Sequence, residues 1–453
     1  MKKIIIAALT LTLVSCSTLE KKDYALFSGT IKNPNSTKLT IVGANNEKIK
    51  EINVSKTGVF ADTLHNVTGF YMFSDGVESS SIYLKNGDDL KLTIDTKQFD
   101  ESIVYTGKGS KVNNFLAQKY LITENLGSNQ SLYSLGEATF LKKATALKDT
   151  LETALKGLDT DFATTEKKEI NYDYIARLAN YENAHKYYTK DTTFTVSNAF
   201  PNPLKNLDLE NEEEFKNSSA YKGIVVRNFY KKADNKAKAE NIPFTDAAIA
   251  LIKNIKGETI KNTLLYNLSY EVSASNKNAK ELYNDIIALS TDEDFKLDLT
   301  KKYNIIKSLV KGNNSPTFKN YENNAGGTSS LEDFKGKYVY IDVWATWCAP
   351  CKAEIPFLKE VEKKYHKKNI AFVSISVDTK KTHDKWKKMI VDKDLKGTQL
   401  IADNDWDSDF IKNYGINGIP RFILIDPEGK IITADAPRPS DKELIDLFND
   451  LKI

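Results

Sequence analysis

Two cysteines stand close together in the last third of the chain, in the run Trp347-Cys348-Ala349-Pro350-Cys351. Two thiols separated by two residues can close a disulfide within the chain and exchange it with disulfides elsewhere. They can also form half of a zinc site. The sequence has three cysteines, and the third, Cys16, lies near the amino terminus, so none is left for a structural bridge. Redox chemistry at Cys348 and Cys351 is therefore the first hypothesis.

The segments around this pair indicate how it is presented. Tyr338–Trp344 is an apolar run interrupted only by Asp342, which is typical of a central strand buried on both faces. Residues 352–365 carry apolar side chains at helical spacing. The turn between strand and helix places Cys348 at a helix amino terminus, where unpaired N–H groups and the helix dipole favour an anion. We therefore expect Cys348 to react as a thiolate.

Further elements follow this unit. Residues 370–377 and 422–425 read as buried strands, and residues 384–391 read as a helix. Strands that alternate with helices predict an α/β layer. The stretch before them, residues 311–330, is rich in Gly, Asn and Ser and marks a domain boundary. A chain of 453 residues is too long for one core, so several domains are expected.

Residues 311–453 resemble the thioredoxin superfamily and, within it, the extracytoplasmic TlpA/ResA-like thiol-disulfide oxidoreductases. The segment between Asp378 and Gly415 is longer than thioredoxin needs and fits the extra helix and strand of that branch. The resemblance is carried by Leu331-Glu332-Asp333-Phe334-Lys335-Gly336-Lys337, Trp344-Ala345-Thr346-Trp347-Cys348-Ala349-Pro350-Cys351, Glu354-Ile355-Pro356 and Gly418-Ile419-Pro420.

The resemblance implies a division of labour between the cysteines. Cys348 would be the exposed nucleophile that forms a mixed disulfide with the substrate, and Cys351 would be the shielded thiol that resolves it. Asp342 matches the buried acid beneath the active site, where desolvation raises the pKa of a carboxyl so that it can take the proton from Cys351.

It also implies a substrate-binding edge. Pro420 matches the cis-proline that faces the dithiol, and its missing N–H leaves the backbone of Ile419 free to pair with a substrate strand. Trp347 would form the lip beside Cys348. Ala349-Pro350 resembles the Gly-Pro of reducing thioredoxins, so we expect a reductant of protein disulfides that needs an electron donor, which the sequence does not identify.

The rest of the chain reads as two different regions. Residues 24–108 alternate short β-rich runs with turn residues, which predicts a small β-sandwich-like domain, and they resemble an uncharacterised β-domain that often precedes thioredoxin domains. Residues 109–310 show apolar residues at helical spacing and predict a helical middle region. The expected fold class is multi-domain α+β with an α/β thioredoxin-like domain at the carboxy terminus.

The amino terminus reads as a leader. Lys2 and Lys3 precede a short apolar run, which is too short to cross a bilayer permanently. Leu13-Val14-Ser15-Cys16 resembles the bacterial lipobox, which implies a signal peptide at 1–15, lipidation of Cys16 and a tether at 16–23. We therefore expect a cell-envelope protein, anchored to a membrane by lipid and facing the periplasm or the cell surface.

Charge and residue spacing exclude other classes. The 64 basic and 61 acidic residues give a net charge of +3, too little to indicate a nucleic-acid partner. The four histidines lack metal-ligand spacing and no second cysteine pair exists, so neither a metal nor a cofactor is expected. One alternative is a thiol peroxidase-like redoxin, although Ala345 stands where peroxiredoxins have threonine. The other is a surface lipoprotein whose amino-terminal regions bind a ligand or partner.

Overall fold

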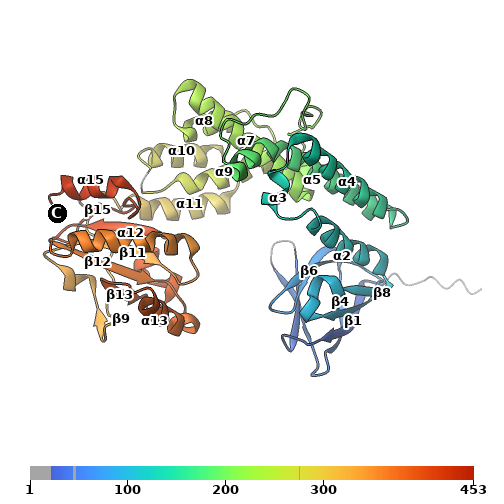
Figure 1. Cartoon of the computed structure of the whole chain (residues 1–453), viewed down its shortest axis with the longest axis horizontal. Helices are drawn as coiled ribbons and strands as arrows, with labels where there is room; N and C mark the ends of the chain where they lie inside the picture. The colour runs from blue at the N-terminus through green and yellow to red at the C-terminus, as the bar shows by residue number, and fades with distance from the viewer. Residues whose placement is uncertain (1–21, 44–46, 275) are drawn as a thin grey trace, which may run out of the picture. The chain divides into compact units, whose positions relative to one another are not determined.

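The computed structural model describes residues 22–43, 47–274 and 276–453. The chain forms two compact units, one of residues up to Leu209 together with Asn217–Val225, and one of Glu210–Lys216 together with Val226–Ile453. The division falls inside the helical region that the sequence predicts at 109–310, so that region contributes helices to both units (Figure 1). The leader and Cys16 lie outside the described residues.

The first unit begins with two four-stranded sheets that enclose one core. Apolar side chains from both sheets meet there, among them Phe27, Leu92, Ile41 and Phe73, as expected of a β-sandwich. The alternating burial along the strands leaves the opposite faces more exposed. In spatial order the sheets are β4(Val59–His65), β1(Tyr24–Lys32), β7(Asp89–Asp95), β8(Val104–Lys108), and β3(Lys48–Asn53), β2(Lys38–Val42), β5(Thr68–Ser74), β6(Ser79–Lys85).

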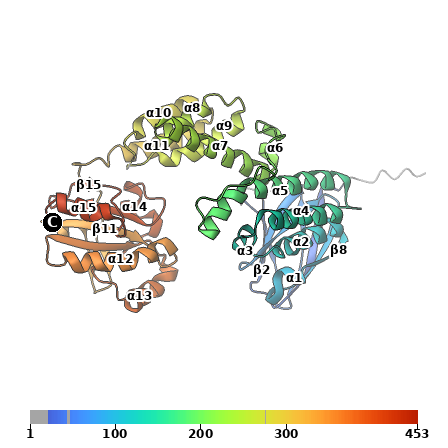
Figure 2. The same ribbon diagram turned by 45° about the horizontal axis from the view of Figure 1, so that its top comes forward.

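Helices follow the sandwich in the first unit. Asp159 caps the longest of them, since its carboxylate accepts a hydrogen bond from the Phe162 N–H at 3.2 Å. The Tyr181 hydroxyl donates to the Leu135 carbonyl at 2.6 Å, so this tyrosine packs between helices. Figure 2 shows α4 and α5 side by side. The helices are α1(Phe99–Ser102), α2(Ser110–Glu124), α3(Asn129–Tyr133), α4(Glu137–Ala154) and α5(Thr160–Thr189).

A second group of helices precedes the carboxy-terminal domain. Leu309 from the end of this group is buried in the core of that domain, and Ile305 packs against it. The helices are α6(Glu212–Asn217), α7(Ser219–Glu240), α8(Phe244–Ile252), α9(Glu258–Leu268), α10(Ala279–Leu289) and α11(Glu293–Ile306). None of the helices in the described ranges is long and apolar enough to span a membrane.

The carboxy-terminal domain is built on one seven-stranded sheet, drawn in orange to red in Figure 1. The central strand β11 runs parallel to β12 and antiparallel to β14. The helices of this domain are α12(Ala349–Tyr365), α13(His383–Asp392), α14(Asp409–Asn413) and α15(Lys442–Asp450). In spatial order the strands are β10(Thr328–Ser329), β9(Tyr321–Asn323), β13(Thr398–Ile401), β12(Ile370–Ser376), β11(Tyr338–Trp344), β14(Arg421–Ile425) and β15(Ile431–Thr433).

Side chains on the two faces of β11 pack into two different hydrophobic cores. Val339, Ile341 and Val343 share a core with apolar residues of α13 and α14. Tyr340 shares the other core with residues of α12 and α15. Because side chains alternate along a strand, Asp342 is on the same face as Tyr340 and therefore under α12.

The entry segment of this domain closes one edge of the sheet. The Gly312 N–H donates to the Ile431 carbonyl at 2.8 Å, and the Ile431 N–H donates to the Asn313 carbonyl at 2.8 Å. The Ser315 N–H donates to the Gly429 carbonyl at 3.0 Å. The predicted boundary segment therefore pairs with the outer side of β15. The predicted fold class, with a β-rich amino-terminal region, a helical middle region and a thioredoxin-like domain, is confirmed.

Candidate active site

The two cysteines lie at the junction between the central strand β11 and helix α12. Strand β11 ends at Trp344 and α12 begins at Ala349, so Cys348 occupies the cap position of α12. Cys348 and Cys351 form a disulfide, and the Cys351 N–H donates a hydrogen bond to Cys348 Sγ at 3.1 Å. This N–H is one of the unpaired donors of the first helical turn, and in the reduced protein it favours a thiolate at Cys348.

The two cysteines are equally buried in this disulfide form, each with 4% of its surface exposed. The expectation that Cys348 is exposed and Cys351 shielded is therefore wrong for the oxidised state. In this state the Cys348 sulfur is bonded to Cys351. Trp347 beside the pair is exposed, with 51% of its surface accessible, and Ala349 and Pro350 between the cysteines are exposed as well.

A buried carboxylate that the sequence analysis did not single out fixes the loop before Cys348. Asp378 accepts hydrogen bonds from the Thr346 N–H at 2.8 Å and the Thr346 hydroxyl at 2.7 Å. The Ser376 hydroxyl also donates to it at 2.7 Å. Asp378 and Thr346 are almost completely buried. A strand end followed by an acid was the only signal in the sequence, and many strands end that way.

The proline of the predicted substrate edge lies level with the end of β11. The Ile419–Pro420 peptide bond is cis. The next residue, Arg421, pairs with Val343 in the antiparallel register of β14 and β11, so Pro420 lies opposite the end of the strand that leads to Cys348. Ile419 is partly buried against the core.

A second tryptophan lies beside the predicted lip. The ring centroids of Trp347 and Trp406 are 6.4 Å apart with an interplanar angle of 35°. Trp406 belongs to a short 3-10 helix, Asp405–Asp407, in the long segment between β13 and β14. The sequence analysis assigned this segment to the TlpA-like branch without assigning Trp406 a role. The two rings form an aromatic surface next to the dithiol.

Asp342 lies behind the disulfide. Together with Cys351 it lines a small cavity under α12. Asp342 is largely buried and keeps a small part of its surface exposed. Burial raises the pKa of Asp342 to about 8, and the nearby carboxyls of Glu362 and Glu354 act in the same direction. A hydrogen bond from Ser374 opposes the shift. Asp342 therefore gains and loses its proton near neutral pH, as a residue that accepts and passes on protons requires.

Glu354 is placed by the carboxy-terminal segment of the domain. Its carboxylate accepts hydrogen bonds from the Ser440 N–H at 3.1 Å and the Ser440 hydroxyl at 3.0 Å. Arg438 lies 3.9 Å from the same carboxylate. Glu354 therefore ties the first turns of α12 to the segment before α15. Pro356 follows it inside the helix.

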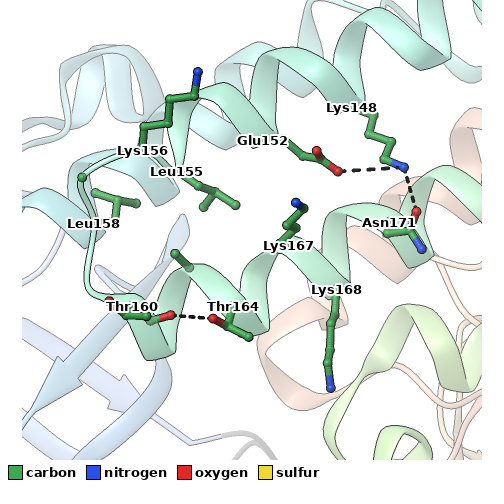
Figure 3. Close-up of a pocket in the computed structure, with 12 residues that line it drawn as sticks. Lys148, Glu152, Leu155, Lys156, Leu158, Thr160, Thr164, Lys167, Lys168 and Asn171 are labelled. Atoms are coloured by element: carbon green, nitrogen blue, oxygen red, sulfur yellow. Dashed lines mark hydrogen bonds and ion pairs between the residues drawn. The ribbon is translucent and has the colours of Figure 1, made fainter.

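The first unit contains a different kind of hollow. It is an open space of about 670 Å³ lined by residues of α4 and α5, among them Lys156, Lys167 and Lys168. In Figure 3 the side chains of Lys156 and Lys168 extend away from the space between the two helices. Lys148 is paired with Glu152 at 3.8 Å and with Asn171 at 2.8 Å. This hollow contains none of the predicted site residues and no cysteine. Across the described ranges, no group of three or more His, Cys, Asp or Glu side chains is placed to hold a metal ion.

Comparisons with known proteins point to the carboxy-terminal domain. Residues 310–450 match the family model Redoxin. The thiol-disulfide oxidoreductase ResA of Bacillus thuringiensis subsp. konkukian is 36% identical over 107 residues, 24% of this chain and 59% of that protein. The chain thus spans well under two thirds of that relative. The thioredoxin-like protein YneN of Bacillus subtilis is 30% identical over 137 residues, 30% of this chain and 77% of that protein.

A solved structure is also similar to part of this chain. The thioredoxin domain of a thiol-disulfide oxidoreductase from Bacteroides vulgatus is 31% identical and covers 32% of this chain and 99% of that one, with a TM-score of 0.29. That score is too low to support an argument about the chain as a whole. The family model and the Bacillus subtilis relative confirm the resemblance inferred from the sequence. Through its carboxy-terminal domain, the chain belongs to the redoxin family of thioredoxin-like proteins.

Proposed function

We propose that the protein is an extracytoplasmic thiol-disulfide oxidoreductase whose Cys348–Cys351 pair reduces disulfides in other proteins. The observation that carries this proposal is the pair itself, closed as a disulfide at the amino terminus of α12 with a raised-pKa acid, Asp342, behind it. The names of the relatives support the same chemistry.

The reaction transfers two electrons to the substrate. The Cys348 thiolate attacks one sulfur of a substrate disulfide, forms a mixed disulfide and releases the other substrate sulfur as a thiolate. The ionised form of Asp342 then takes the proton from Cys351, and the resulting thiolate attacks Cys348 Sγ. The mixed disulfide breaks, the second substrate sulfur leaves as a thiolate, and the protein keeps the Cys348–Cys351 disulfide. A dithiol donor must reduce that disulfide before the next cycle.

The substrate is expected to approach along the edge next to Pro420. Proline has no N–H, so the backbone polar groups of Ile419 are the ones available to an extended substrate segment. Trp347 and Trp406 offer aromatic surface at the same place. This arrangement favours an unfolded or flexible protein segment over a small rigid disulfide.

The cellular location rests on the leader alone. Lipidation at Cys16 would tether the protein to a membrane and expose it to the periplasm or the cell surface. A Cys16→Ala chain is expected to move from the membrane fraction to the soluble fraction after cell lysis. If this chain stays in the membrane fraction, the lipid anchor is rejected.

The redox potential of the Cys348–Cys351 couple tests the direction of electron flow. The full chain with Cys16→Ser is equilibrated in glutathione or dithiothreitol buffers, and its free thiols are trapped. A potential near that of thioredoxin, roughly −270 mV, supports a reductant. A value near roughly −120 mV would make the protein an oxidant. Failure to form the disulfide at all would reject the enzyme and leave a binding protein.

A further inference from the structure

A second buried acid, Glu362, lines the cavity that contains Cys351 and Asp342. It lies about three helical turns beyond Cys351 on α12 and therefore on nearly the same side of the helix. Ile355 and Leu358 lie between them and line the cavity as well. The residues of α12 that line the cavity thus lie on the buried side of the helix between the resolving cysteine and Glu362.

Two of the residues that line this cavity each carry a buried polar atom with no hydrogen-bond partner among the described residues. These atoms are Trp344 Nε1 and Gln399 Oε1. Unpaired buried polar atoms are costly and are commonly satisfied by internal water. The cavity volume of about 10 Å³ is close to what one water molecule needs. With the carboxyls of Asp342 and Glu362, such a water would have several partners.

The fold leaves room for Glu362 at this place. A Cβ atom on Gly397 would come within 2.7 Å of Glu362 Oε1 and 2.9 Å of the Phe372 carbonyl. Gly397 also has a positive φ of 66°, which favours glycine. A side chain at this position would displace the carboxyl from the cavity, so the loop before β13 is shaped around it.

The charges around Glu362 differ on its two sides. Burial raises the pKa of Glu362 to about 7, while Lys359 and the exposed Lys396 lower it. On the inner side lies Asp342, whose pKa the charge on Glu362 raises further. Glu354 is the other acid near Asp342. Glu362 therefore titrates near neutral pH, with a buried acid on one side and cations near the solvent on the other.

We propose that Glu362 is the proton outlet of the active site. This inference rests on the proposed function. The proton that leaves Cys351 during resolution passes to Asp342, crosses the cavity to Glu362 and is released to solvent beside Lys359 and Lys396. When a donor dithiol reduces the protein, the proton returns by the same route. Glu362 touches neither the substrate nor the sulfurs, so it is a relay residue.

A single-turnover reaction separates the relay from the chemistry. The full chain with Cys16→Ser is reduced and mixed with an excess of 5,5′-dithiobis(2-nitrobenzoate). Attack by Cys348 releases the first thionitrobenzoate, and resolution by Cys351 releases the second, so each step has its own absorbance phase. The two phases are recorded between pH 5 and pH 9 for the parent chain and for Glu362→Gln. The matched control is Glu360→Gln, an exposed residue on the same helix.

In Glu362→Gln the first phase is expected to stay unchanged. The second phase should slow about tenfold at pH 7, less than the roughly 10²-fold or more expected for loss of a direct base. Its pH midpoint should move down, because the charge that raises the pKa of Asp342 is gone. Added imidazole should restore the second phase by carrying the proton. Glu360→Gln should match the parent chain in both phases.

A surface variant keeps the test decisive if Glu362→Gln does not fold. Lys359→Gln removes a cation that lowers the pKa of Glu362, so Glu362 stays neutral to a higher pH and raises the pKa of Asp342 less. The midpoint of the second phase should therefore move down, as in Glu362→Gln. The relay is rejected if the second phase of Glu362→Gln superposes on that of the parent chain, or if Lys359→Gln leaves the midpoint unchanged. If the parent chain itself releases fewer than two equivalents, the proposed function fails instead.

Discussion

Replacing Asp342 with asparagine should stabilise the oxidised protein at neutral pH. The pKa of this carboxyl rises from 3.8 to about 8 in the folded state, mainly through burial. Below about pH 4 both the folded and the unfolded chain hold the proton. Between about pH 4 and pH 8 only the folded state holds it, so the free energy of unfolding falls as the pH rises.

The size of the effect follows from that window. Each pH unit within it lowers the free energy of unfolding by about 1.4 kcal/mol. From pH 4 to pH 7 the loss is at most about 4 kcal/mol, and about 2 kcal/mol remains after a discount for the partial exposure of Asp342. The Asp342→Asn chain has no such loss. Its free energy of unfolding should therefore exceed that of the parent chain by about 2 to 4 kcal/mol at pH 7 and equal it near pH 4.

Tryptophan fluorescence can follow this domain within the full chain. The sequence has four tryptophans, Trp344, Trp347, Trp386 and Trp406, and all lie in the carboxy-terminal domain. Urea unfolding of the oxidised parent and of Asp342→Asn is measured at several pH values from 4 to 9. A stability difference that is the same at pH 4 and pH 7 would refute the proton-linked reasoning. It would show that asparagine changes packing rather than titration.

Three further outcomes are expected. Asp378→Asn should lower the free energy of unfolding by about 1.5 to 3 kcal/mol, seen in the same urea experiment, because it disturbs the charge-assisted bonds to Thr346. Cys351→Ser should accumulate a mixed disulfide between Cys348 and a protein substrate on non-reducing gels, and a chain that releases its substrate would contradict the assigned order of attack. Trp406→Ala should raise KM for a protein disulfide about fivefold and leave a small aromatic disulfide unaffected, as steady-state kinetics would show.

The strand, turn and helix around the dithiol could be predicted from the sequence because their apolar patterns are strong. Tyr338–Trp344 is β11 with the same bounds, and the helix predicted at 352–365 lies within α12. The predicted strand at 38–42 also agrees with β2. At these places local pattern and tertiary environment favour the same structure.

The sequence analysis failed where a polar side chain faces inward. It predicted helices across 109–310, which includes α2, but gave no role to Asn113, which is fully buried there and bonds the backbone N–H and carbonyl of Tyr83, both at 2.8 Å. It likewise gave no role to Glu362, although this acid stands at helical spacing from Ile355 and Leu358 on the apolar side of α12. An acid within an apolar stripe was the signal that could have been used. The residues that share its cavity, among them Asp342 on β11 and Gln399 on β13, are distant in the sequence, so the sequence pattern could not show them.

The pairing of residues 312–315 with β15 has a consequence for how the carboxy-terminal domain can exist alone. A strand at the edge of a sheet is a template for other chains unless something covers it. In this protein residues 312–315, which lead into the domain, cover the edge strand. They form hydrogen bonds with both the N–H and the carbonyl of Ile431. A domain cut at Thr317 would expose that edge and tend to self-associate, whereas one that begins before Leu309 would keep its edge closed. The connecting segment thus also protects the domain against aggregation.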